Sequence, residues 1–133
     1  MDVRELVGGS TQMCDPTTSM AAAAAVMVGE GVGSLGVSGR EGLSGIVTER
    51  DVLRAVAAGV DLASEPVTAW MTPNPDTVPA DMTVDDAAVW MVAAGYRHLP
   101  VMDGQSLLGV ASIKDLLWAI TEQHLNEDAS SGS

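Results

Sequence analysis

Phenylalanine is absent from this sequence of 133 residues, and aromatic residues make up only 3% of it. Hydrophobic residues nevertheless make up 47%, so a folded core must be filled by Ala, Val, Leu and the eight Met residues. Such small or flexible side chains let neighbouring helices approach closely. At this length the chain fits one compact globular unit rather than two independent domains of ordinary size.

Cysteine and basic residues are also scarce. Cys14 is the only cysteine, which excludes an internal disulfide and a metal site built from several cysteines, and it is compatible with a reducing compartment. Lys and Arg together number six against 18 Asp and Glu, which gives a formal net charge of −12 at pH 7. Phosphate backbones require clustered basic residues, so this composition argues against binding to nucleic acid.

Long hydrophobic runs are missing as well. The longest apolar stretch, residues 20–28, is far shorter than the roughly 18 residues that a membrane-spanning helix needs. No basic segment precedes it, as a secretory signal peptide would require. We therefore expect a cytoplasmic protein that does not insert into a membrane.

The sequence does contain an internal repeat. An offset of 64 residues aligns the two halves without a gap, and ten positions are identical between residues 25–56 and 89–120. Chance would give about two or three identities in a sequence of this composition, so the halves are interpreted as duplicated copies. The identical pairs are Met27/Met91, Val28/Val92, Gly31/Gly95, Leu35/Leu99, Val37/Val101, Leu43/Leu107, Gly45/Gly109, Asp51/Asp115, Leu53/Leu117 and Ala55/Ala119.

Each copy predicts the same order of elements, β-α-β-β-α, and the chain is therefore expected to have an α+β fold. Brief strands are expected at Met13-Cys14 and Thr77-Val78, ended by Pro16 and Pro79. The other expected elements are helices from the N-caps Ser19 and Thr83 to Gly31 and Gly95, strands near 35–37, 43–47, 99–102 and 107–111, and final helices after Thr48 and Ser112.

The predicted boundaries follow the repeat. Residues 1–63 form the first repeat and residues 64–124 the second, and each of about 60 residues can bury only a modest fraction of its surface. The two repeats should therefore pack face to face and be stable only together. Residues 125–133 are polar and Ser-rich, and they are expected to be a disordered tail.

The junction before each final helix carries the best candidate site. Each junction has a hydroxyl at the helix start, a cation two residues later and a carboxylate one residue further. These groups suit a ribosyl phosphate, because free amides and the hydroxyl can bind the phosphate while the carboxylate accepts hydrogen bonds from the ribose. The candidate residues are Thr48, Arg50 and Asp51 in the first repeat and Ser112, Lys114 and Asp115 in the second.

A purely structural interpretation competes with this one. Thr48-x-x-Asp51 and Ser112-x-x-Asp115 also have the spacing of a capping box, which starts a helix without any ligand. The recurrence of the pattern in register, with a basic residue in both copies, favours ligand binding, because a net-acidic protein must concentrate positive charge to hold an anion.

The paired pattern G-h-(V/A)-(T/S)-x-(R/K)-D resembles the CBS (cystathionine beta-synthase) domain family. The stretch from Gly95 to Val101, which reads GYRHLPV, and the Met71-Thr72-Pro73 segment carry the same resemblance, which covers residues 1–124. The resemblance implies two repeats related by a pseudo-two-fold axis, two clefts between them and a homodimer stacked into a flat disc. It also implies an adenine nucleotide as ligand: AMP, ADP or ATP, with S-adenosylmethionine as a further candidate.

The resemblance also implies roles for individual residues. Thr48 and Asp51 would serve one cleft, and Ser112 and Asp115 the other. Other implied contacts are Met13, Cys14, Thr77 and Val78 with the base, and Arg97 and His98 with the phosphates. The first repeat departs from the family pattern, since it has Gly33-Ser34 in place of Arg97-His98, so unequal sites are expected.

These observations together predict a standalone regulatory module. It would have no obligatory cofactor, would bind a nucleotide between its repeats and would transmit occupancy to an unknown effector protein or through its own dimer. The alternative is a dimerisation or interaction module that binds no ligand. An enzyme is not expected, because the sequence shows no metal cluster, activated nucleophile or paired general acid and base.

Overall fold

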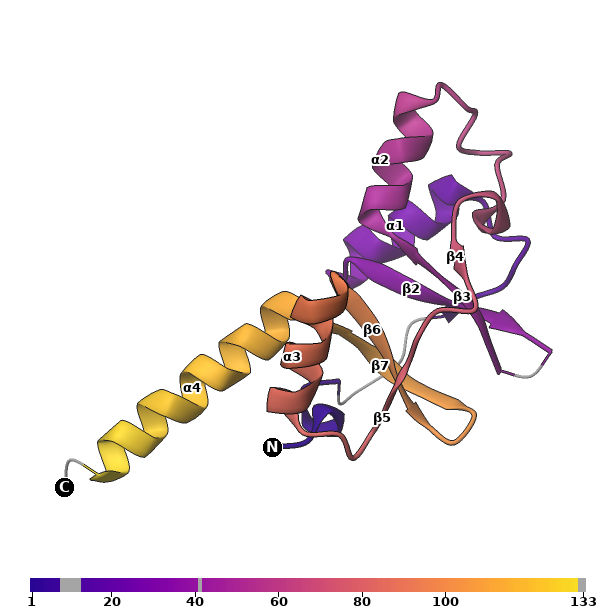
Figure 1. Cartoon of the computed structure of the whole chain (residues 1–133). Coiled ribbons are helices and arrows are strands. Elements are labelled where there is room, and N and C mark those ends of the chain that lie inside the picture. The colour runs from indigo at the N-terminus through magenta and orange to yellow at the C-terminus, as the bar shows by residue number, and fades with distance from the viewer. Residues whose placement is uncertain (8–12, 41, 132–133) are drawn as a thin grey trace.

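The computed structural model describes residues 1–7, 13–40 and 42–131, and Figure 1 shows two similar halves joined at their sheets, with α4 extending away from them. In chain order the elements are η1 (Val3–Leu6), β1 (Met13–Cys14), α1 (Met20–Glu30), β2 (Ser34–Gly39), β3 (Gly42–Thr48), α2 (Glu49–Ala57), η2 (Val67–Ala69), β4 (Thr72–Pro73), β5 (Val78–Pro79), α3 (Val84–Ala94), β6 (His98–Asp103), β7 (Ser106–Ser112) and α4 (Ile113–Ser131). The predicted α+β fold and the β-α-β-β-α order of each repeat are confirmed.

The first helix of each repeat begins and ends where the sequence predicts. Ser19 Oγ accepts a hydrogen bond from the N–H of Ala22, and Thr83 Oγ1 accepts one from the N–H of Asp86. Both helices end at a glycine in the left-handed conformation, Gly31 with φ of 68° and the equivalent Gly95 with φ of 78°. A side chain at either glycine would be strained, which explains the identity of this pair.

Two small sheets carry the equivalent strands in the same register. The first sheet has the order β1-β2-β3-β4 and the second the order β5-β6-β7. In each sheet a parallel pair precedes an antiparallel hairpin, and Val37 pairs with Gly45 as Val101 pairs with Gly109. β4 was not predicted, and β5 lies one residue later than predicted. It includes Pro79, which can occupy the last position of a strand because no further ladder bond is needed from its nitrogen.

The opening segment of each repeat packs against the other repeat. Val3 is fully buried in the core of the second repeat, where its N–H donates to Met82 O at 2.9 Å. Val67 is fully buried in the core of the first repeat, where its N–H donates to Thr18 O at 2.9 Å. The boundary at residues 63 and 64 therefore separates the copies in sequence but not in packing.

Four of the identical pairs fill equivalent places in the two cores. The side chains at these positions are buried in both repeats, and they come from the first helix, the first hairpin strand and the last helix. These pairs are Met27/Met91, Leu35/Leu99, Val37/Val101 and Ala55/Ala119. Leu, Met, Val and Ala thus form both cores without any phenylalanine, as the composition requires.

Glycine occurs at both Gly45 and Gly109 because the opening segment of the other repeat passes directly over each of them. These two opening segments are called the exchanged segments below. A Cβ at Gly45 would lie 2.5 Å from Met71 Sδ, and one at Gly109 would lie 2.7 Å from Val7 Cβ. Met71 and Val7 are themselves equivalent positions, 64 residues apart. The absence of a side chain at each glycine therefore allows each exchanged segment to contact the sheet of the other repeat.

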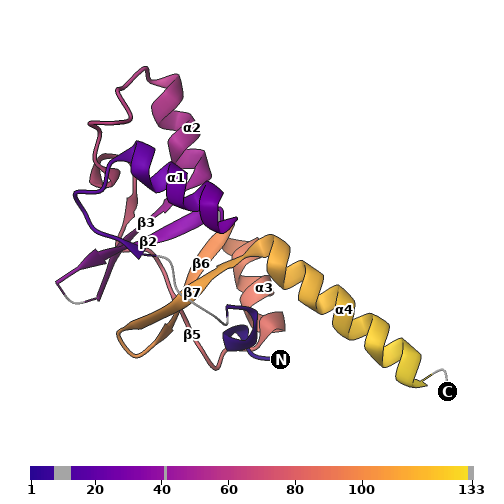
Figure 2. The same cartoon turned by 180° about the vertical axis from the view of Figure 1, so that it is seen from behind.

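Helix α4 is much longer than its counterpart α2 and runs on to Ser131 (Figure 2). Its last turns occupy part of the tail that was predicted to be disordered, and residues 132 and 133 lie outside the described part of the chain. The physical reason is that no Gly or Pro interrupts residues 113–131, so the helix can propagate through polar residues. No helix among the described residues has the length and apolar character needed to cross a bilayer.

We predict that Gly109→Val loosens the contact between the repeats. The added side chain would collide with Val7, and overpacking of this kind costs about 1–3 kcal/mol of unfolding free energy. Urea unfolding checks this, with Gly29→Ala as the control. No atom lies within 4 Å of the Cβ position at Gly29, and alanine favours a helix, so the control should be neutral or stabilising. Equal stability of Gly109→Val and the wild type would contradict this account of the glycine.

Candidate ligand-binding cleft

A cleft of about 1350 Å³ lies between the two repeats. The first repeat lines it with the C-terminal end of α1, the residues that follow this helix and the first turn of α2. The second repeat lines it with Arg97, the start of β6, the end of β7 and the first residues of α4, and Leu6 and Val7 complete the wall. The N-termini of α2 and α4 both border this space, so the two predicted junctions meet at one cleft.

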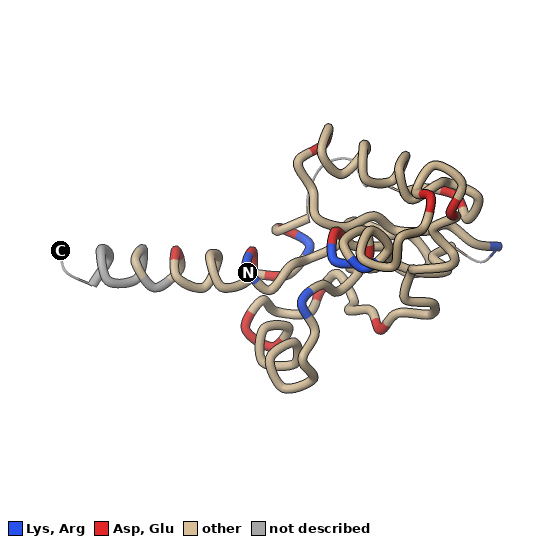
Figure 3. Tube along the Cα trace, turned by 90° about the horizontal axis from the view of Figure 1, so that it is seen from above, with Lys and Arg blue, Asp and Glu red and all other residues tan. Residues whose placement is uncertain are grey.

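Positive charge is concentrated at the cleft. Figure 3 shows acidic residues along much of the chain, whereas basic residues occupy few positions. Arg50, Arg97 and Lys114 line the cleft, which is half of the six basic residues in the sequence. Two carboxylates, Glu49 and Asp115, line it as well. Such an arrangement can hold an anion of modest charge within a protein of strongly negative net charge.

The motif of the second repeat opens onto this cleft. Ser112 Oγ accepts a hydrogen bond from the N–H of Asp115 at 3.0 Å and so caps α4, while the carboxylate of Asp115 remains exposed. The N–H of Ile113 donates to Arg97 O at 2.9 Å, which places Arg97 directly beside the start of α4. Ser112, Lys114 and Asp115 therefore lie together with Arg97 and His98 along the same cleft.

His98 is half-buried at the centre of this group. Burial lowers the pKa of its imidazole from the usual value, and the neighbouring Arg97 acts in the same direction. The carboxylates of Glu49, Asp115 and Asp51 oppose this shift. Because the net pKa shift is downward, the imidazole is mainly neutral at neutral pH and gains a proton only in more acidic solution.

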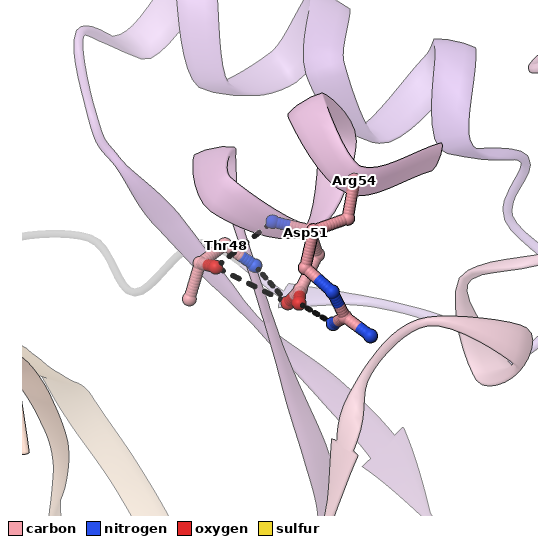
Figure 4. A network of polar contacts seen from close by, with 3 residues as sticks. All are labelled: Thr48, Asp51 and Arg54. Atoms are coloured by element: carbon pink, nitrogen blue, oxygen red, sulfur yellow. Dashed lines mark hydrogen bonds and ion pairs between the residues drawn. The ribbon is translucent and has the colours of Figure 1, made fainter. Parts of the chain in front are cut away.

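The motif of the first repeat is closed on itself (Figure 4). One carboxylate oxygen of Asp51, Oδ2, accepts hydrogen bonds from the N–H of Thr48 at 2.9 Å and from its hydroxyl at 3.1 Å. The other oxygen, Oδ1, accepts from Arg54 Nη1 at 3.0 Å. Asp51 is only 7% exposed, and neither it nor Thr48 lines the cleft. The capping-box interpretation thus describes this copy, and only Arg50 of its three candidate residues borders the cleft.

Arg54 is held in place by Trp70, which lies in the opening segment of the second repeat. Its guanidinium carbon lies 5.5 Å from the ring centroid of Trp70, a cation–π distance. Trp70 in turn donates from Nε1 to Glu65 Oε1 at 3.1 Å. The equivalent of Arg54 in the second repeat is Trp118, which is exposed, so the second repeat has no basic residue at this position to neutralise Asp115.

The four residues expected to contact a base lie outside this cleft. Val78 is 1% exposed in the core of the second repeat, and Cys14 packs partly buried against the core of the first. Burial raises the pKa of the Cys14 thiol. Met13 is exposed on β1, and Thr77 lines a separate cavity of about 330 Å³. The assignment of these residues to a base remains untested.

Sequence reasoning missed several residues of the cleft. Glu49 is the most important, because among the described residues of the first repeat its carboxylate is the only acidic group in the lining. Its equivalent, Ile113, is apolar, and a comparison of the variable position within the two motifs could have signalled this difference. Among the described residues, no three His, Cys, Asp or Glu side chains are grouped so as to hold a metal ion.

Comparisons with known proteins agree with the fold and the repeat. An uncharacterized 17.7 kDa protein in the bps2 3′ region of Acidianus ambivalens is 35% identical over 124 residues, which cover 92% of this chain and 74% of that protein. A CBS-domain containing protein from Agrobacterium tumefaciens has a structure that matches with a TM-score of 0.79 at 30% identity, covering 90% of this chain and 98% of that one.

A CBS domain protein from Pyrobaculum aerophilum, solved in complex with AMP, matches with a TM-score of 0.78 at 30% identity and covers 86% of this chain and 89% of that one. The sequence model of the CBS domain matches residues 3–58 and again residues 67–122, which correspond to the two repeats. The chain therefore belongs to the CBS domain family, as a pair of tandem CBS domains.

Proposed function

We propose that this chain is a regulatory module that binds an adenine nucleotide in the cleft between its repeats, at the motif of the second repeat. The observation that carries the proposal is the gathering of Arg97, Lys114 and Arg50 around one cleft in a chain with a net charge of −12. The AMP complex of the related Pyrobaculum protein supports the choice of ligand.

Each group at this motif has a suitable chemical role. The hydroxyl of Ser112, the positive end of the α4 dipole and the cations of Arg97 and Lys114 would bind the phosphate. The exposed carboxylate of Asp115 would accept hydrogen bonds from the ribose hydroxyls. None of these groups needs to form or break a covalent bond, so the proposed role is binding without catalysis, with occupancy passed on to a separate effector.

Removal of the Asp115 charge should weaken nucleotide binding. Hydrogen bonds to a charged group contribute about 1.5–3 kcal/mol each, so Asp115→Asn should raise the Kd for AMP about 10- to 100-fold. Isothermal titration calorimetry measures this. Glu122→Gln removes a charge from an exposed position on the same helix, outside the cleft, and should leave the Kd unchanged.

A thermal-shift panel separates this proposal from the alternative of a module without ligand. Nucleotide at about 100 times its Kd adds about 2.7 kcal/mol to the unfolding free energy and should raise the Tm by several degrees. A wild-type protein whose Tm does not respond to AMP, ADP, ATP or S-adenosylmethionine would favour the dimerisation module instead.

Binding should also depend on pH through His98. In the free protein its pKa is lowered, and a phosphate in the cleft would favour the protonated imidazole and raise that pKa. Binding then takes up a proton, so affinity should increase as the pH falls through the pKa of the complex and level off below that of the free protein. Titrations with AMP between about pH 8 and 6.5 test this, because the phosphate itself gains a proton only near pH 6. His98→Gln should abolish the dependence in this range, and a slope that persists in the variant would assign it to another group.

We also propose that the chain forms a homodimer through its helices. Val28 and Val92 are equivalent positions that are 84% and 69% exposed, and Leu53 and Leu117 are 68% and 52% exposed. Val28 and Leu53 also line the cleft, but Val92 and Leu117 lie outside both the cleft and the cores, so neither core packing nor the cleft explains these two exposed apolar residues. In a two-fold symmetric dimer both chains contribute the same surface to the interface. This suits an exposed apolar pattern that recurs in both repeats.

The dimer can be tested without touching the cleft. Val92 and Leu117 do not line it, so Val92→Asp combined with Leu117→Asp should give a monomer that still binds nucleotide. Light scattering after size exclusion reports the mass. Ser106→Asp adds one negative charge at an exposed position on β7 and should leave the dimer intact. A wild-type protein that elutes as a monomer, or a double variant that stays dimeric, would disprove this interface.

A further inference from the structure

The two copies of the motif present different side chains to the cleft, although their backbones are arranged alike. In the first repeat the N–H of Glu49 donates to Gly33 O at 3.0 Å, and in the second the N–H of Ile113 donates to Arg97 O at 2.9 Å. In the first repeat, Gly33 thus stands at the position equivalent to the cationic Arg97. The acidic Glu49 stands at the position equivalent to the apolar Ile113. The first repeat therefore contributes a negative group at the place where the second contributes a positive one.

Glu49 occupies the space that the missing side chain leaves. A Cβ at Gly33 would lie 3.3 Å from Glu49 Oε1, so the carboxylate lies directly over the glycine. Both residues line the cleft together with His98 and Asp115. Among the described residues, the ion pairs within 4 Å are Arg4 with Asp103 and Arg54 with Asp51, and neither involves Glu49. The charge of Glu49 therefore acts on whatever enters the cleft.

Asp51, the other acidic residue of this turn, cannot act in the same way. Both of its carboxylate oxygens are occupied, by Thr48 and by Arg54, and it is buried outside the cleft. The residues of α2 that line the cleft are Glu49, Arg50, Val52 and Leu53. The first repeat thus lacks an available Thr-x-x-Asp site, and it forms the opposite wall of the site in the second repeat.

We propose that the cleft holds one nucleotide per chain and that Glu49 determines its specificity, favouring a nucleoside monophosphate over a triphosphate. This inference rests on the proposed nucleotide binding and adds the charge class of the ligand and the residue that selects it. A phosphate of charge about −2 can be balanced by Arg97, Lys114 and Arg50. Each further phosphate adds negative charge to a cleft that already contains Glu49 and Asp115, and the whole chain has a charge of −12.

The test is calorimetry with AMP and ATP on the full chain, without divalent cations so that the charge of ATP is not neutralised. The wild type should bind one equivalent of AMP per chain and bind ATP more weakly. Glu49→Gln should narrow the ratio of the two Kd values by roughly 5- to 30-fold, mainly through tighter ATP binding, because the roughly two extra charges of ATP would no longer face the charge of Glu49 across a partly solvated cleft. Glu49→Asp keeps the charge and should keep the preference for AMP.

Glu30→Gln is the matched control, since it removes a carboxylate at an exposed position on α1 that does not line the cleft. If it narrows the ratio as much as Glu49→Gln does, overall charge and not Glu49 sets the preference, and the proposal is wrong. An unchanged ratio in Glu49→Gln, or two equivalents of AMP per wild-type chain, would also overturn it. Failure of the wild type to bind any nucleotide would instead refute the proposed function from which this inference starts.

Discussion

Val3 and Val67 are fully buried, each in the hydrophobic core of the repeat to which it does not belong by sequence. Separating the repeats would expose both side chains and break the backbone hydrogen bonds beside them, so neither half is complete alone. Gly45 and Gly109 allow this exchange by leaving room for Met71 and Val7. Because the exchange sets how the two sheets lie against each other, it also determines the cleft between them.

Duplication has preserved the backbone of the two repeats while their side chains have acquired different tasks. The first repeat uses its Thr-x-x-Asp motif to start α2, and Arg54 with Trp70 neutralises and covers the carboxylate. The second repeat has Trp118 at the position of Arg54 and leaves Asp115 exposed at the cleft. A buried carboxylate needs a hydrogen-bonding partner within the protein, whereas a carboxylate at a cleft can accept hydrogen bonds from water or from a bound ligand.

The distribution of charge connects the composition to the proposed selectivity. A chain with a net charge of −12 repels anions at long range, and this repulsion grows with the charge of the ligand. In the proposed site, Arg97 and Lys114 would overcome it locally for a small anion, since interactions across the cleft are screened less than those across solvent. Glu49 would limit that gain from the opposite wall. The proposed site would thus have enough positive charge to bind one phosphate group and enough negative charge to lower its affinity for a ligand with several.

The sequence by itself determined the repeat, the order of the main elements, the ends of the first helix of each repeat and the residues of the two motifs, because periodicity, capping side chains and glycine conformations act over a few residues. It also singled out Arg97, His98, Ser112, Lys114 and Asp115 as candidate residues, and these five line one cleft. Only the tertiary structure decided that Val3 and Val67 exchange repeats, that Arg54 closes the first motif and that Glu49 faces the second. These features depend on contacts between segments that lie far apart in the chain or on which face of a helix turns inward, so the residue patterns by themselves did not single them out.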